Sequence, residues 1–370
     1  MRGVLCLEDG FAIEGELWNH RGDAVGEVVF STSMTGYEDA LTDPSYCGQI
    51  LVFSFPMIGN YGFPPGSGQS EKVAVRGLVV RDLWDADASH SLLKSLEPST
   101  CPILFGADTR ALVLHLRERG SKRGVIARTS EAGPTAQELV ELRRRAAQFT
   151  MAQVVQEVSC KSASFLGDPS APLGTLALVD FGCKSGIVTM LLERGFRVCR
   201  VPPDAKADEI LSLEPSCVLL SNGPGDPEDN VQAIATAERL LERGEVPLFG
   251  VCLGHQILAK AASARITKLK YGHHGSNHPV KDIGCGRILV TSQNHNYAVD
   301  QAALPSSVSV THLNLNDGTV EGIAISGSGK TLAESVQFHP EGGPGPANPF
   351  FWDRIIKAAR RDGLGGVANA

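Results

Sequence analysis

The sequence lacks several features by which common classes of protein are recognised. Its nine cysteines are at least 16 residues apart, so no CxxC pair is available to bind zinc or to form a redox motif. No apolar run approaches the ~18 residues of a membrane helix, and the first residues turn acidic too soon for a signal peptide. Lys and Arg number 34 against 41 Asp and Glu, which argues against a general nucleic-acid binder. We therefore expect a cytoplasmic protein with reduced thiols, no membrane segment and no nucleic-acid partner.

Length and composition are those of a folded protein with more than one domain. At ~150 residues per domain, 370 residues predict two domains. Hydrophobic residues make up 42% and charged residues 20%, which is ordinary for a soluble globular chain. Glycine is in excess, with 40 of 370 residues, or about 11%, against about 7% on average. We expect some of these glycines where the backbone turns tightly or approaches a substrate.

The two halves of the chain differ in pattern. Residues 1–150 mix short alternating stretches with turns and predict a smaller mixed α+β domain, with helices over 108–119 and 135–149. Residues 151–173 are rich in Ser, Ala, Pro and Gly and predict a linker. In residues 174–370, buried apolar runs alternate with helical stretches, which predicts an α/β domain with a mostly parallel sheet flanked by helices.

The segment GVCLGHQ, residues 250–256, stands where a buried strand runs directly into a helix. It has the G-x-C-x-G pattern of a nucleophile elbow, in which flanking glycines permit a strained turn. Cys252 would lie at a helix N-terminus, which favours thiolate over thiol, and the N–H of Leu253 would point at a developing oxyanion. The alternative is that Cys252 is a small buried cysteine like the other eight.

A base for this nucleophile is available in FHPE, residues 338–341, at the end of the last apolar strand. His339 and Glu341 are two residues apart, so in an extended chain they share a face. His339 could take the thiol proton, and Glu341 could orient the imidazole ring. The alternative is a strand that ends at His-Pro, followed by a solvated glutamate.

A third segment, SNGPGDP at residues 221–227, follows another buried strand. The turn from Gly223 to Gly225 could present backbone N–H groups to an oxyanion or a substrate. It could equally be a tight turn in which Asp226 caps the next helix, and both interpretations can hold together. All three segments follow strands of one predicted sheet, so we expect them at the same edge.

In their order and spacing, these three segments resemble class I glutamine amidotransferases of the triad type. Four further segments make the resemblance more specific, because they are similar to the small subunit of carbamoyl phosphate synthetase. Two are in the first half of the chain, MTGYEDALTDPSY and GADTRAL, and two are in the second half, YGHHGSNHPVKD and TSQNHNYAVD. The amidotransferase motifs are shared by many biosynthetic enzymes, whereas MTGYEDALTDPSY and HHGSNHPV are distinctive of this subunit. The resemblance covers nearly the whole chain.

The resemblance implies a role for each matching position. Cys252 matches the nucleophile, His339 the general base and Glu341 the orienting carboxylate. Positions that hold glutamine in that family match Ser45, Gly223, Gly225, Leu253, Gln256, Asn294, Asn296 and Tyr297. Asn296 departs from the glycine that the family more often has there. Because Asn tolerates left-handed backbone geometry, a backbone contact could survive at this position.

Several histidines could be mistaken for functional residues. Beyond Arg265 the pattern predicts shorter strands and turns, and His273, His274 and His278 are interpreted as part of a polar loop. The family uses no metal here, so we expect none. His255 lies in the first turn after the nucleophile, where packing or hydrogen bonding suits it better than catalysis.

The resemblance implies hydrolysis of L-glutamine to glutamate and ammonia. The ammonia would pass to a large synthetase subunit that makes carbamoyl phosphate for arginine and pyrimidine biosynthesis. ATP and Mg²⁺ are expected only on that subunit, since the sequence has no GxxxxGK[ST] loop and no cofactor is implied for this chain. Free ammonia is mostly protonated in neutral water, so its transfer needs a sheltered path.

Three alternatives remain open at this point. The chain could be an amidotransferase subunit of another biosynthetic enzyme, which leaves residues 1–120 without a role. It could be a free thiol hydrolase of γ-glutamyl compounds, which needs no dedicated partner. It could also be a non-catalytic regulatory or scaffold subunit, although the retention of Cys252, His339 and Glu341 argues against a decayed site.

Overall fold

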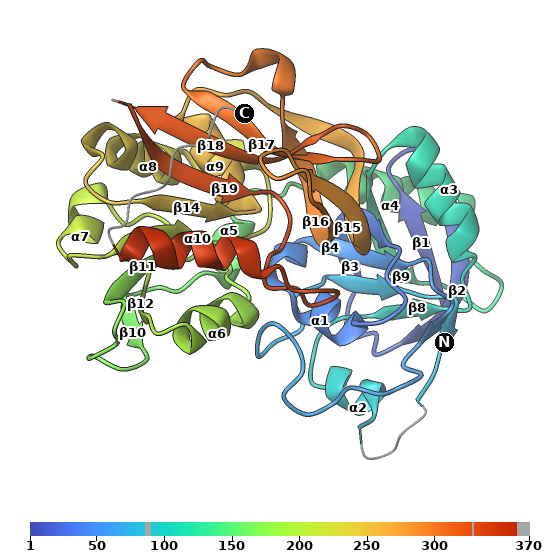
Figure 1. Ribbon diagram of the computed structural model, residues 1–370. Helices are drawn as coiled ribbons and strands as arrows, with labels where there is room; N and C mark the ends of the chain where they lie inside the picture. Colours follow the sequence, from blue (N-terminus) through green and yellow to red (C-terminus); the bar gives the residue numbers. More distant parts are fainter. Residues whose placement is uncertain (86–89, 328, 361–370) are drawn as a thin grey trace. The chain divides into compact units, whose positions relative to one another are not determined.

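The computed structural model describes residues 1–85, 90–327 and 329–360 (Figure 1). By internal contacts the chain forms two compact units. The first contains Met1–Val154 and Lys270–Gly275, and the second contains Val155–Leu269 and Ser276–Ala370. Among the helices of the described residues, none has the length and apolar character needed to cross a membrane.

The first unit is built around a closed β-barrel. Its strand order is β1-β2-β8-β6-β4-β3-β9, closed by antiparallel pairing of β1 with β9. The barrel strands are β1 (Arg2–Leu7), β2 (Ala12–Trp18), β3 (Ala24–Ser31), β4 (Gln49–Phe53), β6 (Gly77–Val79), β8 (Ile103–Phe105) and β9 (Lys122–Arg128). The other elements are α1 (Tyr37–Thr42), η1 (Pro44–Tyr46), β5 (Met57–Ile58), β7 (Asp82–Leu83), α2 (Leu92–Leu96), α3 (Thr109–Arg119) and α4 (Ala136–Gln148).

Local signals fix both longer helices of this unit, and the prediction of each is confirmed. Helix α3 begins after Asp108, whose carboxylate accepts a hydrogen bond from the N–H of Ala111, and it ends at Gly120. Helix α4 begins with a capping box between Thr135 and Glu138. The unit is the smaller mixed α+β domain expected from the sequence.

A ten-stranded sheet in the order β10-β12-β11-β13-β14-β19-β18-β16-β15-β17 belongs to the second unit, except for residues 270–275 of β15, which are counted in the first. Its strands are β10 (Ser164–Leu166), β11 (Thr175–Val179), β12 (Arg197–Val201), β13 (Cys217–Leu220), β14 (Leu248–Val251), β15 (Ile266–Asp282), β16 (Ile288–Val299), β17 (Val308–Asn314), β18 (Val320–Gly327) and β19 (Lys330–Val336). Neighbours from β12 to β19 pair in parallel, and β18 and β10 pair antiparallel at either side. This is the predicted α/β fold with a mostly parallel core.

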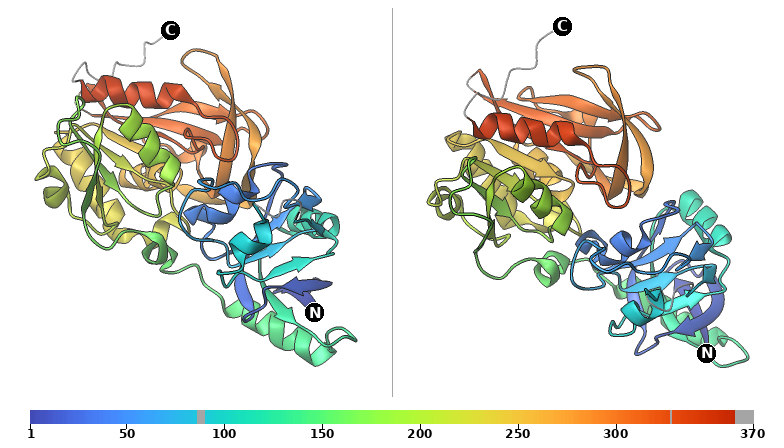
Figure 2. Two further views of the ribbon diagram at one scale, coloured as in Figure 1. Left: turned by 90° about the horizontal axis from the view of Figure 1, so that it is seen from below. Right: turned by 60° about the horizontal axis from the view of Figure 1, so that its bottom comes forward.

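Helices cover both faces of the parallel strands. They are α5 (Val154–Val158), α6 (Ser185–Glu193), α7 (Ala207–Leu211), α8 (Val231–Arg243), α9 (Leu253–Ala261) and α10 (Pro349–Ala359), with short turns η2 (Pro227–Asp229) and η3 (Gln301–Ala303). Side chains of β11 alternate, so Leu178 packs with α6 and α10 while Val179 packs with α8 and α9. Helices α6 and α10 lie on the same face (Figures 1 and 2). The parallel strands therefore point their carboxyl ends at one edge, where the three predicted segments begin.

The prediction for the residues after Arg265 is wrong in part. Instead of shorter strands and a polar loop, β15 runs for 17 residues and β16 for 12. His273, His274 and His278 all lie within β15, and the first two are buried. Within the first unit, the carbonyl oxygen of His274 accepts a hydrogen bond from the N–H of Thr32. Main-chain pairing of this kind explains why the polar segment is extended.

Candidate active site

Cys252 stands between strand β14 and helix α9 with the dihedral angles φ 53° and ψ −105°. A positive φ is costly for a residue with a Cβ, by roughly 1–3 kcal/mol, and such strain is concentrated at functional sites. The two flanking glycines make this turn possible. A Cβ on Gly250 would lie 2.7 Å from the carbonyl carbon of Gly254, and a Cβ on Gly254 would lie 2.1 Å from the carbonyl oxygen of Leu220. The sequence thus forms the predicted strained elbow.

His339 and Glu341 meet as the sequence predicts. Nδ1 of His339 lies 2.7 Å from Oε1 of Glu341, and both residues are buried. The main-chain N–H of His339 donates to the carbonyl oxygen of Ser292 at 3.0 Å, which holds the residue just after β19. With Nδ1 on the carboxylate, Nε2 is the ring nitrogen left to exchange a proton.

The electrostatics of this pair favour its charged form. Burial alone would lower the pKa of His339, but the Glu341 carboxylate and the nearby Cys252 thiol outweigh burial and raise it. Burial would likewise raise the pKa of Glu341, and the charges of Lys184 and His339 overcome it and lower that pKa. An imidazole with a raised pKa is a ready acceptor for a thiol proton.

Lys184 is a part of this site that the sequence reasoning missed. It is 1% exposed and follows β11, and its Nζ lies 2.9 Å from Oε1 of Glu341. Nζ also donates to the carbonyl oxygens of Gly342, at 2.8 Å, and Gly343. The available signal was a lysine in the short, largely apolar turn between a buried strand and helix α6, since this residue type is almost never fully buried without a charged partner. Lys184 compensates the buried charge of Glu341.

The segment after β13 forms the tight turn with an Asp226 cap that was one of its two interpretations, and its contact with an oxyanion or a substrate stays a prediction. A Cβ on Gly223 would lie 2.5 Å from the carbonyl oxygen of Phe181, so only glycine fits there, and Gly225 has φ 92°. Asp226 caps η2, because its Oδ1 accepts a hydrogen bond from the N–H of Glu228 at 2.9 Å. The loop is both a glycine-dependent turn and a helix cap.

The predicted glutamine-binding residues of the second unit lie around the elbow. Sγ of Cys252 is 3.6 Å from the carbonyl oxygen of Asn294. The Gln256 side chain donates to the carbonyl oxygen of Tyr297 at 3.0 Å. Asn296 lies within strand β16 and has no positive φ. The left-handed geometry considered for this position is therefore not used.

Family comparisons agree with the two-part architecture. Residues 5–126 match the model described as "Carbamoyl-phosphate synthase small chain, CPSase domain". Residues 177–358 match "Glutamine amidotransferase class-I". The chain belongs to the carbamoyl phosphate synthase small chain family. It is thus a glutamine amidotransferase chain of that enzyme family.

Relatives of this chain are matched along nearly their full length. The carbamoyl phosphate synthase small chain of Symbiobacterium thermophilum is 44% identical over 97% of this chain and 99% of its own. That of Caldanaerobacter subterraneus subsp. tengcongensis is 44% identical over 98% of each. That of Methanopyrus kandleri is 42% identical over 95% of this chain and 96% of its own. The family resemblance in the sequence is confirmed.

Ser45, the remaining predicted glutamine-binding residue, belongs to the first unit of this small chain. It lies buried in η1, and its main-chain N–H donates to the Asp43 carboxylate at 2.9 Å. This cap fixes the local backbone at the position that carries the hydroxyl group. A contact of Ser45 with glutamine stays a prediction.

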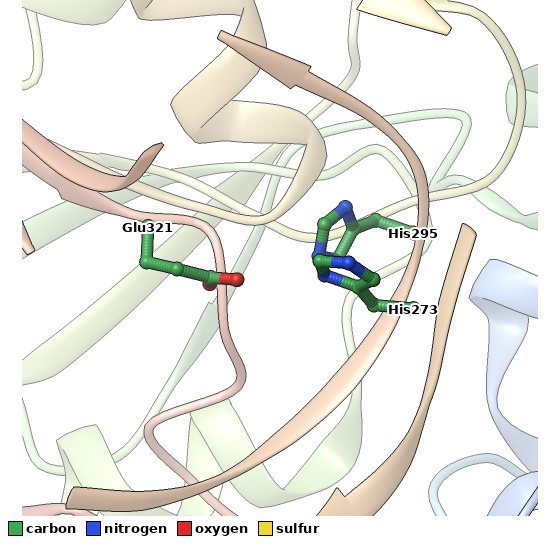
Figure 3. Close-up of side chains that lie close together, drawn as sticks. All are labelled: His273, His295 and Glu321. Carbon is green, nitrogen blue, oxygen red and sulfur yellow. The ribbon is translucent and has the colours of Figure 1, made fainter. Parts of the chain in front are cut away.

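A buried polar network supports the strand that carries Asn294. Nε2 of His295 lies 3.0 Å from Oε1 of Gln293, whose side-chain amide donates to Glu321 at 2.9 Å. Asn314 donates to the other oxygen of Glu321 at 2.9 Å. Figure 3 shows the Glu321 carboxylate directed toward His295. That no metal serves this small chain stays a prediction.

His255 is held away from any catalytic role by its bonding. Its Nδ1 lies 2.9 Å from Oγ of Ser335, and the residue is fully buried. Burial, with a further effect of His312, lowers its pKa to about 3. Packing and hydrogen bonding, as the sequence predicted, account for this residue.

The neutral state of His255 makes the stability of this small chain depend on pH. Since an unfolded histidine titrates near 6.5, unfolding takes up a proton between pH 6.5 and 3, and stability is lost as the pH falls through this range. We expect His255→Asn to reduce the pH dependence of the free energy of unfolding by up to about 1.4 kcal/mol per pH unit. Urea unfolding of both proteins at pH 4–8 measures this pH dependence. The difference between their free energies of unfolding at pH 8, where His255 is neutral in both states, gives the effect of lost packing alone. An identical dependence in both proteins would refute the assignment.

Proposed function

We propose that this small chain hydrolyses L-glutamine to glutamate and ammonia through Cys252, His339 and Glu341. The observation that carries the proposal is the strained cysteine beside an imidazole whose other nitrogen is bonded to a buried carboxylate. A structural cysteine has no need of positive φ or of a charged partner. Together with the family membership, this arrangement supports catalysis over a scaffold role.

The reaction follows from the chemistry of these groups. His339 accepts the thiol proton, and the Cys252 thiolate adds to the side-chain amide carbon of glutamine. The C–N bond then breaks as His339 returns the proton to the departing ammonia, which leaves a γ-glutamyl thioester. A water molecule, giving its proton to His339, hydrolyses the thioester and releases glutamate. Glu341 keeps the imidazole oriented throughout.

Backbone amides supply the stabilisation of the oxyanion in this proposal. Leu253 begins helix α9 directly after the nucleophile, where N–H groups and the helix dipole favour negative charge. The Gly223–Gly225 loop would provide further N–H groups. Gln256, Asn294, Asn296, Tyr297 and Ser45 would hold the substrate.

The ammonia would be used by a separate large chain. We propose that this partner binds ATP and Mg²⁺ and makes carbamoyl phosphate in the cytoplasm, for arginine and pyrimidine biosynthesis. The printed names of the relatives, which are small chains of a synthase, support a large-chain partner. The nine free cysteines are compatible with a reducing compartment.

Comparing two nitrogen sources tests the proposal. We expect the large chain of the same host to make carbamoyl phosphate from ammonium salts when alone. It should gain glutamine-dependent synthesis only when this small chain is added in a stable complex. Carbamoyl phosphate is measured with each source at equal total nitrogen. Glutamine hydrolysis without complex formation would instead favour a free thiol hydrolase.

A further inference from the structure

Tyr297 is fixed through both its main chain and its side chain. Its carbonyl oxygen accepts a hydrogen bond from Gln256 at 3.0 Å and lies 2.8 Å from Nδ1 of His295. Its hydroxyl group donates to Oδ2 of Asp226 at 2.8 Å. Nζ of Lys268 lies 5.6 Å from the ring centroid, which favours a cation–π contact. The main-chain contacts need no particular side chain, but the bond to Asp226 requires a hydroxyl group.

Asp226 divides its two carboxylate oxygens between two tasks. Oδ1 accepts the N–H of Glu228 and so caps η2, while Oδ2 accepts the Tyr297 hydroxyl. The carbonyl oxygen of Asp226 accepts a further bond from the Asn230 side chain at 3.0 Å. One carboxylate thus joins the end of the glycine loop to strand β16, 71 positions further along the chain.

The loop between these contacts is held differently at its two ends. At its start, Gly223 packs so closely on Phe181 and Leu253 that a Cβ would lie within 3.0 Å of both. At its far end, Gly225 has a positive φ of 92°, a conformation that favours glycine, and it has no side chain that could pack against a neighbour. The adjoining Asp226 is therefore the anchor of this end.

We propose that the Tyr297 hydroxyl and the Asp226 carboxylate form a strap that holds the Gly223–Gly225 loop in place for glutamine binding. Both are positioning residues in this respect, since the strap acts through the loop rather than on the reacting atoms. The strap rests on the proposed glutaminase function, because it is the side-chain contact that would set the affinity of the active site for glutamine.

The strap has a defined kinetic signature. Without it the loop samples more conformations, and ordering it on binding reduces the affinity for glutamine. The triad and the elbow stay intact, so the ground state and the transition state lose the same amount of binding free energy. Such a loss raises KM and leaves kcat nearly unchanged. A hydrogen bond to a charged group corresponds to roughly a ten-fold change.

Tyr297→Phe in the full chain, in complex with its large chain, is the direct test, because it removes one oxygen atom and keeps the ring. We expect KM for glutamine to rise about ten-fold, with kcat within a factor of two. Asp226→Ala should raise KM at least as much, and the double variant should be no worse than Asp226→Ala alone. Asp300→Ala is the matched control, because Asp300 caps η3 in the same way but pairs through Oδ2 with Arg265.

Four outcomes are decisive. An unchanged KM in an active Tyr297→Phe enzyme overturns the strap, and so does an equal rise in KM for Asp300→Ala. A fall in kcat with KM unchanged would assign Tyr297 to the chemistry and also overturn it. Calorimetry on a Cys252→Ser background tests the strap separately from the proposed glutaminase function, because it measures glutamine binding without turnover. The strap predicts that Tyr297→Phe raises the dissociation constant for glutamine about ten-fold. If the wild type neither hydrolyses nor binds glutamine, the proposed function fails, and the strap with it.

Discussion

Cys252→Ser should lower the rate of glutamine hydrolysis by roughly 10⁴-fold or more, since loss of a nucleophile removes the covalent route as a whole. Serine keeps the size and the local backbone, but its hydroxyl is far less acidic than a thiol, so His339 would not generate the anion. The release of glutamate measures the effect. Synthesis of carbamoyl phosphate from ammonium salts by the complex should persist, since it bypasses this site.

Cys285→Ser is the control for this experiment, because Cys285 is exposed and belongs to none of the proposed machinery. It should retain the wild-type rate. A fully active Cys252→Ser enzyme would mean that the nucleophile is misassigned. Loss of the ammonium-dependent activity as well would indicate misfolding rather than a catalytic effect.

Lys184→Met should be the most damaging substitution outside the triad itself. Removing Lys184 takes away one of the two cationic groups beside the buried Glu341 carboxylate and leaves that charge poorly compensated, at a cost of up to about 3–5 kcal/mol. Because Nζ of Lys184 contacts Oε1 of Glu341, the same oxygen that His339 contacts, its loss should also leave the His339–Glu341 pair poorly oriented. We expect a large drop in the free energy of unfolding, measured with urea, together with a loss of glutaminase activity.

Two further variants separate the causes. Lys260→Met breaks an exposed ion pair, in which Nζ of Lys260 lies 2.8 Å from Oε1 of Glu228. It should change the free energy of unfolding far less than Lys184→Met does, because solvent screens an exposed pair. The double variant Lys184→Met with Glu341→Gln has no buried unpaired charge, so its stability should recover while its activity does not. If Lys184→Met were as stable as Lys260→Met, the compensation argument would be wrong.

The geometry of the elbow and of the His339–Glu341 pair could be predicted because their signals are local. Cys252 lies within an apolar run bounded by two glycines, and His339 and Glu341 are neighbours on one short segment. Lys184 could not be assigned a role in this way, because its partner is 157 positions away and no pattern in the sequence pairs the two.

The long strands after Arg265 were missed for a different reason. Strand β15 contains Gly272, Gly275 and Pro279, and both strands contain Ser and Asn, all of which favour turns when only their propensities are considered. In the folded protein Gln293, Glu321 and Asn314 satisfy one another, so polar residues occupy a place in the sheet that apolar ones normally fill. Only the pairing of distant segments makes this environment available.

The position of β19 in the sheet has a consequence for the order of folding. This strand is the last of the ten in sequence, yet it lies between β14 and β18 in the interior of the sheet. The segment that carries His339 follows it directly. During synthesis on the ribosome, Cys252 therefore emerges well before the strand that precedes His339, its proposed base. On the proposed mechanism, an unfinished chain would have the thiol without His339, and we expect it to hydrolyse no glutamine until β19 has paired in the sheet.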